Sequence, residues 1–372
     1  MCRRIFKEQT SETGDIPFYK IGTFGADPDA FISRELFEEY KSKYPYPQKG
    51  DILISASGSI GRTVEFAGNN EYFQDSNIVW LNHDERLSNP FLKCFYSVVK
   101  WAGIEGSTIK RLYNDNILNT VICMPSVPEQ KRIGLFFENL DHLITLHQRK
   151  YDKLTNVKKS MLEKMFPKNG SNVPEIRFKG FTEAWEQRKL SEITDKVTEK
   201  NAGLQYVETF TNSAEFGIIS QRDFFDHDIA KLGSLDGYYI VKTEDFVYNP
   251  RISTSAPVGP INRNKLGRTG VMSPLYTVFR PHDIDTTYLE YFFKCGYWHS
   301  FMNFNGDSGA RSDRFSIRDN VFFQMPIPIP DIDEQRKIGE LLTCLDNLIT
   351  LHQRELEKLQ NIKKSMLEKM FV

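Results

Sequence analysis

The chain has 372 residues, of which 40% are hydrophobic and 13% aromatic, so it can build two or three domains and is not an intrinsically disordered protein. Its formal net charge of −1 argues against a protein that wraps nucleic acid over its whole surface, while leaving room for local basic surfaces. The sequence contains no apolar run near the roughly 18 residues of a membrane span.

Residues 1–128 are predicted to form a mixed, mostly β domain. β-Branched and aromatic residues between turn-forming residues predict five strands, and one helix is expected at 90–101. Pro125 and Pro128 follow the last strand, and proline marks an exit from a sheet because it cannot extend an interior ladder. The predicted strands cover residues 16–21, 51–55, 63–66, 77–81 and 120–124.

Residues 129–166 are predicted to form a long helix, and their sequence returns 205 positions later with 25 identities over 38 positions. Apolar residues spaced alternately by three and four make a seam that is typical of a helix packed on a partner helix. We expect this helix and its copy in 333–372 to pair antiparallel over roughly 55 Å, at about 1.5 Å per residue. The predicted coiled-coil seam contains Ile133, Phe137, Leu140, Ile144, His147, Ile338, Leu342, Leu345, Ile349 and His352.

Two features of these helices allow more than one interpretation. His147 and His352 lie near the helix midpoints, so a symmetric antiparallel pair brings them together. We interpret them as polar seam residues that set the register, with a metal-binding or pH-sensing role as the alternative. A second apolar stripe lies off the seam, and it either packs against the adjoining domain or binds other subunits. This stripe contains Phe136, Leu143, Leu146, Val157, Leu162, Leu341, Leu348, Leu351, Ile362 and Leu367.

Residues 167–184 are predicted to form a linker, and residues 185–332 a second mixed, mostly β domain that precedes the second long helix at 333–372. The two domains resemble each other weakly, whereas the two long helices are nearly the same in sequence. This contrast suggests that the helices form a constant scaffold and that the two domains are variable recognition domains. The fold class is therefore α+β, with two mostly β domains separated by an antiparallel intramolecular coiled coil. In the second domain, strands are expected at 216–220, 246–248, 270–279 and 321–327, and a helix at 286–298.

Motifs that carry catalysis are absent from the sequence. It contains no GxxxxGK[ST] phosphate loop, no HExxH motif and no nucleophile elbow. Asn249-Pro250-Arg251 lacks the second proline and the aromatic residue of the amino-methyltransferase signature. The five cysteines are scattered, which indicates neither a zinc site nor a disulfide framework and suits a reduced, cytoplasmic setting. We therefore expect no catalytic residues and no metal.

Basic residues instead gather in loops rich in small residues. Arginine can pair with guanine edges or phosphates, and small residues allow close backbone approach. Any single arginine is explained equally well as a solvated surface charge. The loops at 106–111 and 306–314, however, occupy matching places in the two domains, so together they are stronger evidence for a binding role than either loop alone. Arg3, Arg4 and Lys7 add charge near residue 1. The candidate DNA-binding residues are Ser57, Ser59, Arg62, Lys110, Arg111, Arg251, Arg263, Arg268, Arg311 and Arg314.

Three sequence features together resemble the specificity (S) subunit of type I restriction–modification enzymes. They are the repeated EQxxI…LDxLITLHQR…LxxxKKSMLEKMF helices, the segment VPEIRFKGFTEAWEQRKLSEI at 173–193, and GDILISASGSIG at 50–61. The resemblance spans nearly the whole chain, and the helix and linker motifs are specific.

The resemblance implies a DNA-recognition role without catalysis. Two target-recognition domains would each read one half of a split sequence in double-stranded DNA. Two modification subunits would dock on the helices and bring S-adenosylmethionine-dependent adenine methylation, and restriction subunits would add ATP- and Mg-dependent translocation and cleavage. This chain would itself bind none of these cofactors.

One departure from the family pattern concerns the first domain. FTEAWEQRKLSEI leads into the second domain, but MCRRIFKEQ at residues 1–9 supplies no counterpart of residues 185–193. We therefore expect the first domain to lack an edge element. The alternative function is a truncated S subunit that acts mainly as a protein-binding adaptor with one DNA-competent domain. A self-contained methyltransferase is a further alternative.

Overall fold

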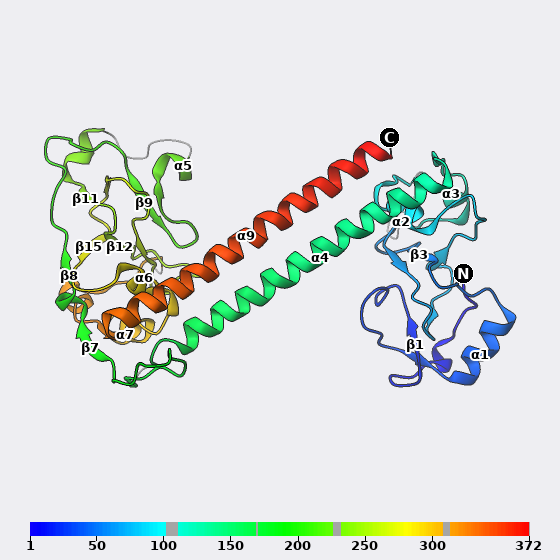
Figure 1. Ribbon diagram of the computed structural model, residues 1–372, viewed down its shortest axis with the longest axis horizontal. Coiled ribbons are helices and arrows are strands. Elements are labelled where there is room, and N and C mark those ends of the chain that lie inside the picture. Colours follow the sequence, from blue (N-terminus) through cyan, green and yellow to red (C-terminus); the bar gives the residue numbers. More distant parts are fainter. Residues whose placement is uncertain (102–110, 169, 226–231, 308–312, 372) are drawn as a thin grey trace. The chain divides into compact units, whose positions relative to one another are not determined.

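The computed structural model describes residues 1–101, 111–168, 170–225, 232–307 and 313–371, and the chain divides into two compact units (Figure 1). Unit 1 consists of Met1–Arg149 and His352–Val372, and unit 2 of Lys150–Leu351. Each unit therefore combines one mostly β domain with part of each long helix. None of the helices within the described ranges is both long and apolar enough to cross a membrane.

Unit 1 contains two small sheets. In one, the central strand β1 pairs antiparallel with β2 and parallel with β5. In the other, β3 pairs antiparallel with β4 and β6, and β3 is buried along its whole length. The strands are β1 (Ile16–Tyr19), β2 (Phe31–Ile32), β3 (Ile52–Ser55), β4 (Thr63–Glu65), β5 (Tyr72–Phe73) and β6 (Ile78–Trp80).

The helices of unit 1 cover these sheets. The Ser33 side chain caps α1 by accepting a hydrogen bond from Leu36 N, and a proline in its first turn suits the start of α2. Phe91 of α2 is 1% exposed in a cluster with Ile52 and Ile54 of β3. The short helices are η1 (Lys7–Gln9), α1 (Arg34–Lys43), α2 (Asn89–Val98) and α3 (Asn114–Leu118).

Unit 2 is built around a four-stranded antiparallel sheet in the order β13-β12-β15-β8. Three two-stranded antiparallel sheets, β10-β9, β11-β14 and β16-β7, accompany it. The strands are β7 (Glu186–Lys189), β8 (Thr194–Lys196), β9 (Phe210–Ser213), β10 (Gly217–Ser220), β11 (Tyr239–Val241), β12 (Phe246–Tyr248), β13 (Ile261–Arg263), β14 (Gly270–Met272), β15 (Thr277–Pro281) and β16 (Pro326–Ile329).

Aromatic side chains fill the core of unit 2. Phe246 of β12 and Phe279 of β15 stack with ring centroids 5.7 Å apart, and Phe293 of α6 packs on both rings. Asp285 caps α6 by accepting from Tyr288 N, and Gly296 ends it in the left-handed region. The short helices are η2 (Leu190–Glu192), α5 (Gln221–Phe225), η3 (Leu232–Gly237), α6 (Thr286–Cys295), α7 (His299–Asn305) and α8 (Asp319–Phe322).

The two long helices are α4 (Val127–Lys164) and α9 (Ile332–Met370), and within each unit they lie side by side and antiparallel (Figure 1). In unit 1, Lys363 pairs with Asp141. In unit 2, Lys158 pairs with Asp346. Because these residues are related by the 205-residue repeat, the same contact forms once in each unit, and the fold contains the antiparallel coiled coil that the heptad pattern predicts.

Burial along the helices follows most of the predicted seam. Phe137, Leu140, Ile338, Leu342 and Leu345 are buried. Ile133, Ile144 and Ile349 are half-buried, as are His147 and His352, whose Nδ1 atoms lie 3.1 Å apart within unit 1. Near the end of α9 the heptad spacing would place Met366 and Met370 on the seam, but both are exposed, and Leu367 is buried instead in a cluster with Cys94, Phe137 and Leu140.

Some predicted strands differ from the structure. Residues 270–279 form two strands, β14 and β15, because a turn at 273–276 separates them. In 321–327 a helical turn precedes the short strand β16. The strand predicted at 120–124 is not formed, and Val121 and Met124 are exposed. A strand requires a hydrogen-bonded neighbour, and none of the described residues of unit 1 pairs with this segment.

Candidate nucleic-acid interface

In each unit, a segment that contains an arginine is hydrogen-bonded to the residues that directly follow the central strand, which is β3 in unit 1 and β12 in unit 2. In unit 1, Leu112 N donates to Ala56 O over 2.8 Å, and Ser57 and Arg111 form an antiparallel bridge. In unit 2, Phe315 N donates to Pro250 O over 2.7 Å, and Arg251 and Arg314 form the matching bridge. The structure therefore places Arg111 and Arg314 at equivalent positions of the two units, while most of the two loops lies outside the described residues.

The bridge in unit 2 brings two positive charges together. Arg251 and Arg314 are both exposed, and neither has an ion pair with any residue in the described part of the chain. Like charges directly opposite each other on paired strands are destabilising, so an anion between them would relieve the repulsion. The adjoining turn adds the hydroxyls of Ser253 and Ser255, which lie 3.2 Å apart. This surface is suited to bind phosphate or base edges.

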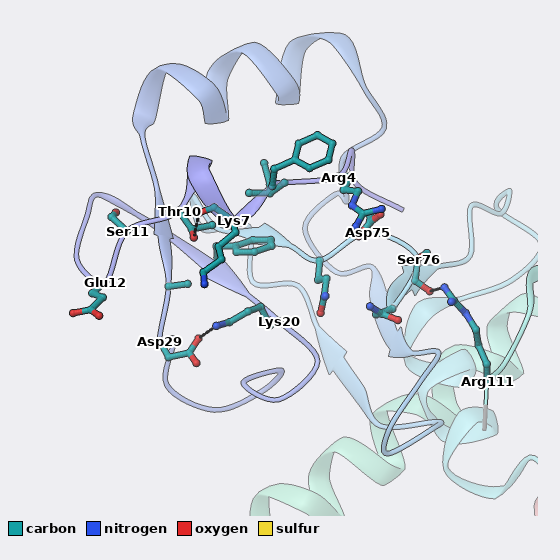
Figure 2. Close-up of a pocket in the computed structure, with 16 residues that line it drawn as sticks. Arg4, Lys7, Thr10, Ser11, Glu12, Lys20, Asp29, Asp75, Ser76 and Arg111 are labelled. Atoms are coloured by element: carbon teal, nitrogen blue, oxygen red, sulfur yellow. Dashed lines mark hydrogen bonds and ion pairs between the residues drawn. The ribbon is translucent and has the colours of Figure 1, made fainter. Parts of the chain in front are cut away.

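In unit 1 the corresponding arginine lines a hollow of about 760 Å³ (Figure 2). Arg111 donates from Nη2 to Ser76 O over 3.2 Å, and Figure 2 shows Lys7 and Lys20 on the other side of the hollow. Lys20 pairs with Asp29 at 2.8 Å, and Arg4 also lines the wall. The hollow therefore collects four basic side chains from segments far apart in the sequence.

A tight loop after β3 fixes the serines and the arginine that were predicted in unit 1. Gly58 and Gly61 have φ values of 65° and 86°, which favour glycine. The Ser55 hydroxyl donates to Ser59 O and accepts from Arg62 N. Ser59 and Arg62 are exposed, whereas Ser57 is 9% exposed and donates to Asn77 Oδ1 over 2.8 Å. Ser57 therefore supports the loop more than it offers a free hydroxyl.

Two predicted arginines of unit 2 are engaged within the protein. The Arg263 side chain is 9% exposed and pairs with Glu244 at 3.0 Å and Glu290 at 2.6 Å. Arg268 donates two hydrogen bonds to Glu208, and these hold the pKa of Glu208 below its usual value. A buried arginine between two carboxylates cannot reach DNA without breaking both pairs. We therefore leave Arg263 out of the candidate interface, whereas Arg268, whose side chain is 48% exposed and pairs with one carboxylate, stays a predicted DNA-binding residue.

Other predicted residues lie outside the described ranges, and some interface residues were missed. Lys110 and Arg311 fall outside the described residues. Lys20, Ser76 and Asn77 line the hollow beside Arg111 but were not predicted. No local sequence signal joins them, because only the packing of the two small sheets brings residue 20 near residues 76 and 111. Within the described ranges, no group of three or more His, Cys, Asp or Glu side chains is arranged to hold a metal ion.

The off-seam stripe of the long helices divides into covered and exposed parts. Val157, Leu162 and Leu341 pack against the core of unit 2, and Ile362 and Leu367 against that of unit 1. The remaining large apolar residues stay exposed in both units. Phe136, Leu143 and Leu146 are exposed on α4 in unit 1, and Leu348 and Leu351 on α9 in unit 2, beside a hollow of about 560 Å³.

Known proteins share both the sequence pattern and the fold. The sequence matches the family described as the type I restriction modification DNA specificity domain over residues 1–156 and 182–361. It is 61% identical over 149 residues to a protein of Haemophilus influenzae named as a type I restriction enzyme specificity subunit, a match that covers 39% of each chain. It is 25% identical over 338 residues to the MjaVIII specificity subunit of Methanocaldococcus jannaschii, covering 86% of this chain and 74% of that protein.

A solved structure gives the same fold. The type I restriction–modification S subunit from M. genitalium aligns with a TM-score of 0.52 at 15% identity, over 100% of this chain and 92% of that one. Such low identity shows likeness of fold alone, whereas the family match covers most of the sequence. This chain therefore belongs to the family of type I restriction–modification DNA specificity subunits.

Proposed function

We propose that this chain is the DNA-reading subunit of a type I restriction–modification complex, in which each unit reads one half of a split target in double-stranded DNA. The observation that carries the proposal is the repeated placement of Arg111 opposite Ser57 and of Arg314 opposite Arg251. The two domains differ in sequence around this shared geometry, so they present different side chains at the same structural position. That is the arrangement expected of two readers with different base preferences.

Reading in two halves has a physical advantage. A bidentate arginine–guanine pair contributes about 1–3 kcal/mol of discrimination against the wrong base. Because both recognition domains belong to one chain, binding of one domain to DNA raises the effective concentration of the other domain near the same DNA molecule, and this strengthens the joint binding. The net charge of −1 leaves little general attraction to DNA, so partner subunits would supply much of the phosphate contact.

The long helices also offer a surface to partner subunits. Leu143 and Leu146 in unit 1 correspond through the repeat to Leu348 and Leu351 in unit 2, and all four are exposed. Two equivalent apolar faces suit two copies of one partner, and we assign them to the two modification subunits. In this proposal S-adenosylmethionine, ATP and Mg act in the modification and restriction subunits, and this chain carries no catalytic step.

Replacing one arginine in each unit tests the proposal. With partner subunits present, Arg111→Ala should relax base preference in one half of the methylated motif, and Arg314→Ala in the other half. The affinity for the intact target should fall by about tenfold or more, as expected for the loss of a specific base contact. Sequencing of the methylated adenines in cells that express each variant would report both halves. Arg86→Ala, whose exposed side chain pairs with Asp84, is the matched control.

The outcome also separates this proposal from an adaptor role. If neither variant changes the methylated motif while both fold normally, the two loops do not read DNA and the assignment fails. If only Arg314→Ala changes it, unit 2 alone is competent to read DNA. Methyl transfer from S-adenosylmethionine by the purified chain alone would contradict the non-catalytic assignment.

A further inference from the structure

A buried glutamine near the start of α4 is bonded to the recognition domain of unit 1 through both ends of its amide. Gln130 is 1% exposed, and its Oε1 accepts a hydrogen bond from Ser88 N over 2.9 Å. Its Nε2 donates to Arg86 O over 2.9 Å and to Pro125 O over 3.0 Å. Ser88 is the N-cap residue of α2. The glutamine side chain therefore joins the long helix to the start of α2.

The same contact occurs in unit 2, at the position related by the 205-residue repeat. Gln335, the counterpart of Gln130, is 2% exposed, and its Oε1 accepts from Asp285 N over 2.9 Å. Its Nε2 donates over 2.9 Å to Pro330 O, which lies five residues before the glutamine, as the bonded proline does in unit 1. Asp285 is the N-cap residue of α6, as Ser88 is of α2. Two domains of different sequence are thus attached to the two long helices by the same bonds.

A glycine that follows each glutamine by four residues allows the domain to approach the helix closely. A Cβ added to Gly134 would lie 2.3 Å from Pro90 Cβ, and a Cβ added to Gly339 would lie 3.1 Å from Thr287 Cγ2. Pro90 and Thr287 both stand two positions after the N-cap residue of their helix. Together, the glutamine and the glycine of each unit form the domain–helix contact of that unit.

The short helix held by this contact also supports the arginine segment of its unit. In unit 1, Phe91 of α2 is buried in one cluster with Leu112, the residue directly after the arginine. In unit 2, Phe293 of α6 is buried in one cluster with Phe315, again the residue directly after the arginine. Protein interiors are densely packed and transmit displacements. A rotation of α2 or α6 against its long helix would therefore move the arginine as well.

We propose that Gln130 and Gln335 are positioning residues that hold each recognition domain at a fixed angle on its long helix and so restrict the spacing of the two half-sites. This inference rests on the proposed function, in which both domains read one DNA molecule. One extra base pair between the half-sites moves one of them by about 3.4 Å and turns it by about 35° around the DNA axis. A domain held at a fixed angle cannot follow this change, whereas a domain that pivots can.

The choice of glutamine follows from its chemistry. Its amide offers one acceptor and two donors at the end of a single side chain, and both kinds of bond are used here. Methionine has about the same length but has no N–H, and its sulfur is only a weak acceptor. A methionine would leave the N-cap amide and the proline carbonyl without these bonds. Because a buried backbone group without a partner is costly, the domain would tilt to expose it to water.

The methylation rate at half-sites of altered spacing tests the proposal. Sequencing of methylated adenines with the wild-type protein defines the target, and DNA duplexes then carry its half-sites with the native spacer or with one base pair more or fewer. With modification subunits and S-adenosylmethionine present, Gln130→Met and Gln335→Met should each read the same half-site sequences. Their preference for the native spacer should fall about tenfold, as expected for the loss of a buried hydrogen bond. Gln360→Met, which changes an exposed glutamine of α9, is the matched control.

The result distinguishes positioning from a general effect on stability. An equal loss of methylation at all three spacers would mean that the glutamines only stabilise the fold, and it would overturn the proposal. An unchanged spacer preference in folded variants would overturn it too. If a methionine variant does not fold, Gln130→Glu or Gln335→Glu, which keeps the acceptor oxygen and loses the donor, decides by the same measurement. A wild-type complex without spacer preference would contradict the proposed function itself, whereas a wild-type preference that the variants retain would contradict only the role of the glutamines.

Discussion

The sequence Lys-Lys-Ser-Met-Leu-Glu-Lys-Met-Phe occurs twice, at residues 158–166 in unit 2 and at 363–371 in unit 1. In unit 2 its last two residues, Met165 and Phe166, are 2% and 1% exposed. In unit 1, Met370 is 46% exposed and Phe371 is half-buried. Identical residues therefore have different burial, and the difference lies in what covers them: Trp185 and its segment in unit 2, and no such segment among the described residues of unit 1.

The largest expected effect comes from removing the phenylalanine in each copy. Phe166→Ala should lower the free energy of unfolding by about 3–5 kcal/mol, because a fully buried ring leaves a cavity among Trp185, Tyr288 and Phe292. Phe371→Ala should cost about 1–2 kcal/mol, because its ring is already partly in water. Urea unfolding followed by tryptophan fluorescence measures both. Equal losses would contradict the difference in burial.

For a pair of helix glycines we expect the opposite result: substitution in unit 1 should destabilise the protein more than the equivalent substitution in unit 2. A Cβ on Gly134 would lie 2.3 Å from Pro90 Cβ and 3.1 Å from its carbonyl carbon, and a proline ring cannot move aside. Gly134→Ala should therefore destabilise unit 1 by about 1–3 kcal/mol despite the higher helix propensity of alanine. A Cβ on Gly339 would meet Thr287 at 3.1 Å. Gly339→Ala should change stability by less than about 1 kcal/mol, and thermal melting compares the two variants.

The repeated ion pairs should give the smallest effect. Lys158→Met and Lys363→Met each remove one partly exposed pair and should cost less than about 1 kcal/mol. Asp346 also accepts a hydrogen bond from Tyr291 over 2.7 Å. When Phe91–Tyr96 of α2 is aligned with Tyr288–Phe293 of α6, Cys94 takes the place of Tyr291 and offers no hydroxyl. The loss in unit 2 should therefore exceed that in unit 1 by a few tenths of a kcal/mol. Double-mutant cycles with Asp346→Asn and Asp141→Asn measure this difference.

The long helices were predictable because their signal is local and repeated. A heptad repeat of apolar residues over 38 positions requires a partner helix. His147 and His352 lie near the midpoints of the two helices, which predicts the contact between their side chains that the structure contains. The equivalence of Arg111 and Arg314 was predictable for a related reason, since matching sequence contexts in the two domains correspond to matching bridges at these two residues.

Features set by distant packing could not be read from the sequence. Met165 and Met370 occupy the same position of the 205-residue repeat, but Met165 is 2% exposed and Met370 is 46% exposed. Arg263 and Arg314 look alike as loop or strand-end arginines. The carboxylate of Glu290 that holds Arg263 in the interior belongs to α6, and its position depends on tertiary folding. The strand expected at 120–124 failed because β-propensity does not form a strand without a neighbour.

The prolines of β16 have a consequence for self-association. Pro326 and Pro328 have no N–H, so two of the four positions of this strand cannot donate to a further strand. The counterparts in unit 1 are Val121 and Cys123, which retain their N–H groups. At high protein concentration, edge-to-edge aggregation should therefore begin at unit 1, and a single proline in place of Val121 should delay it, as light scattering over a concentration series would show.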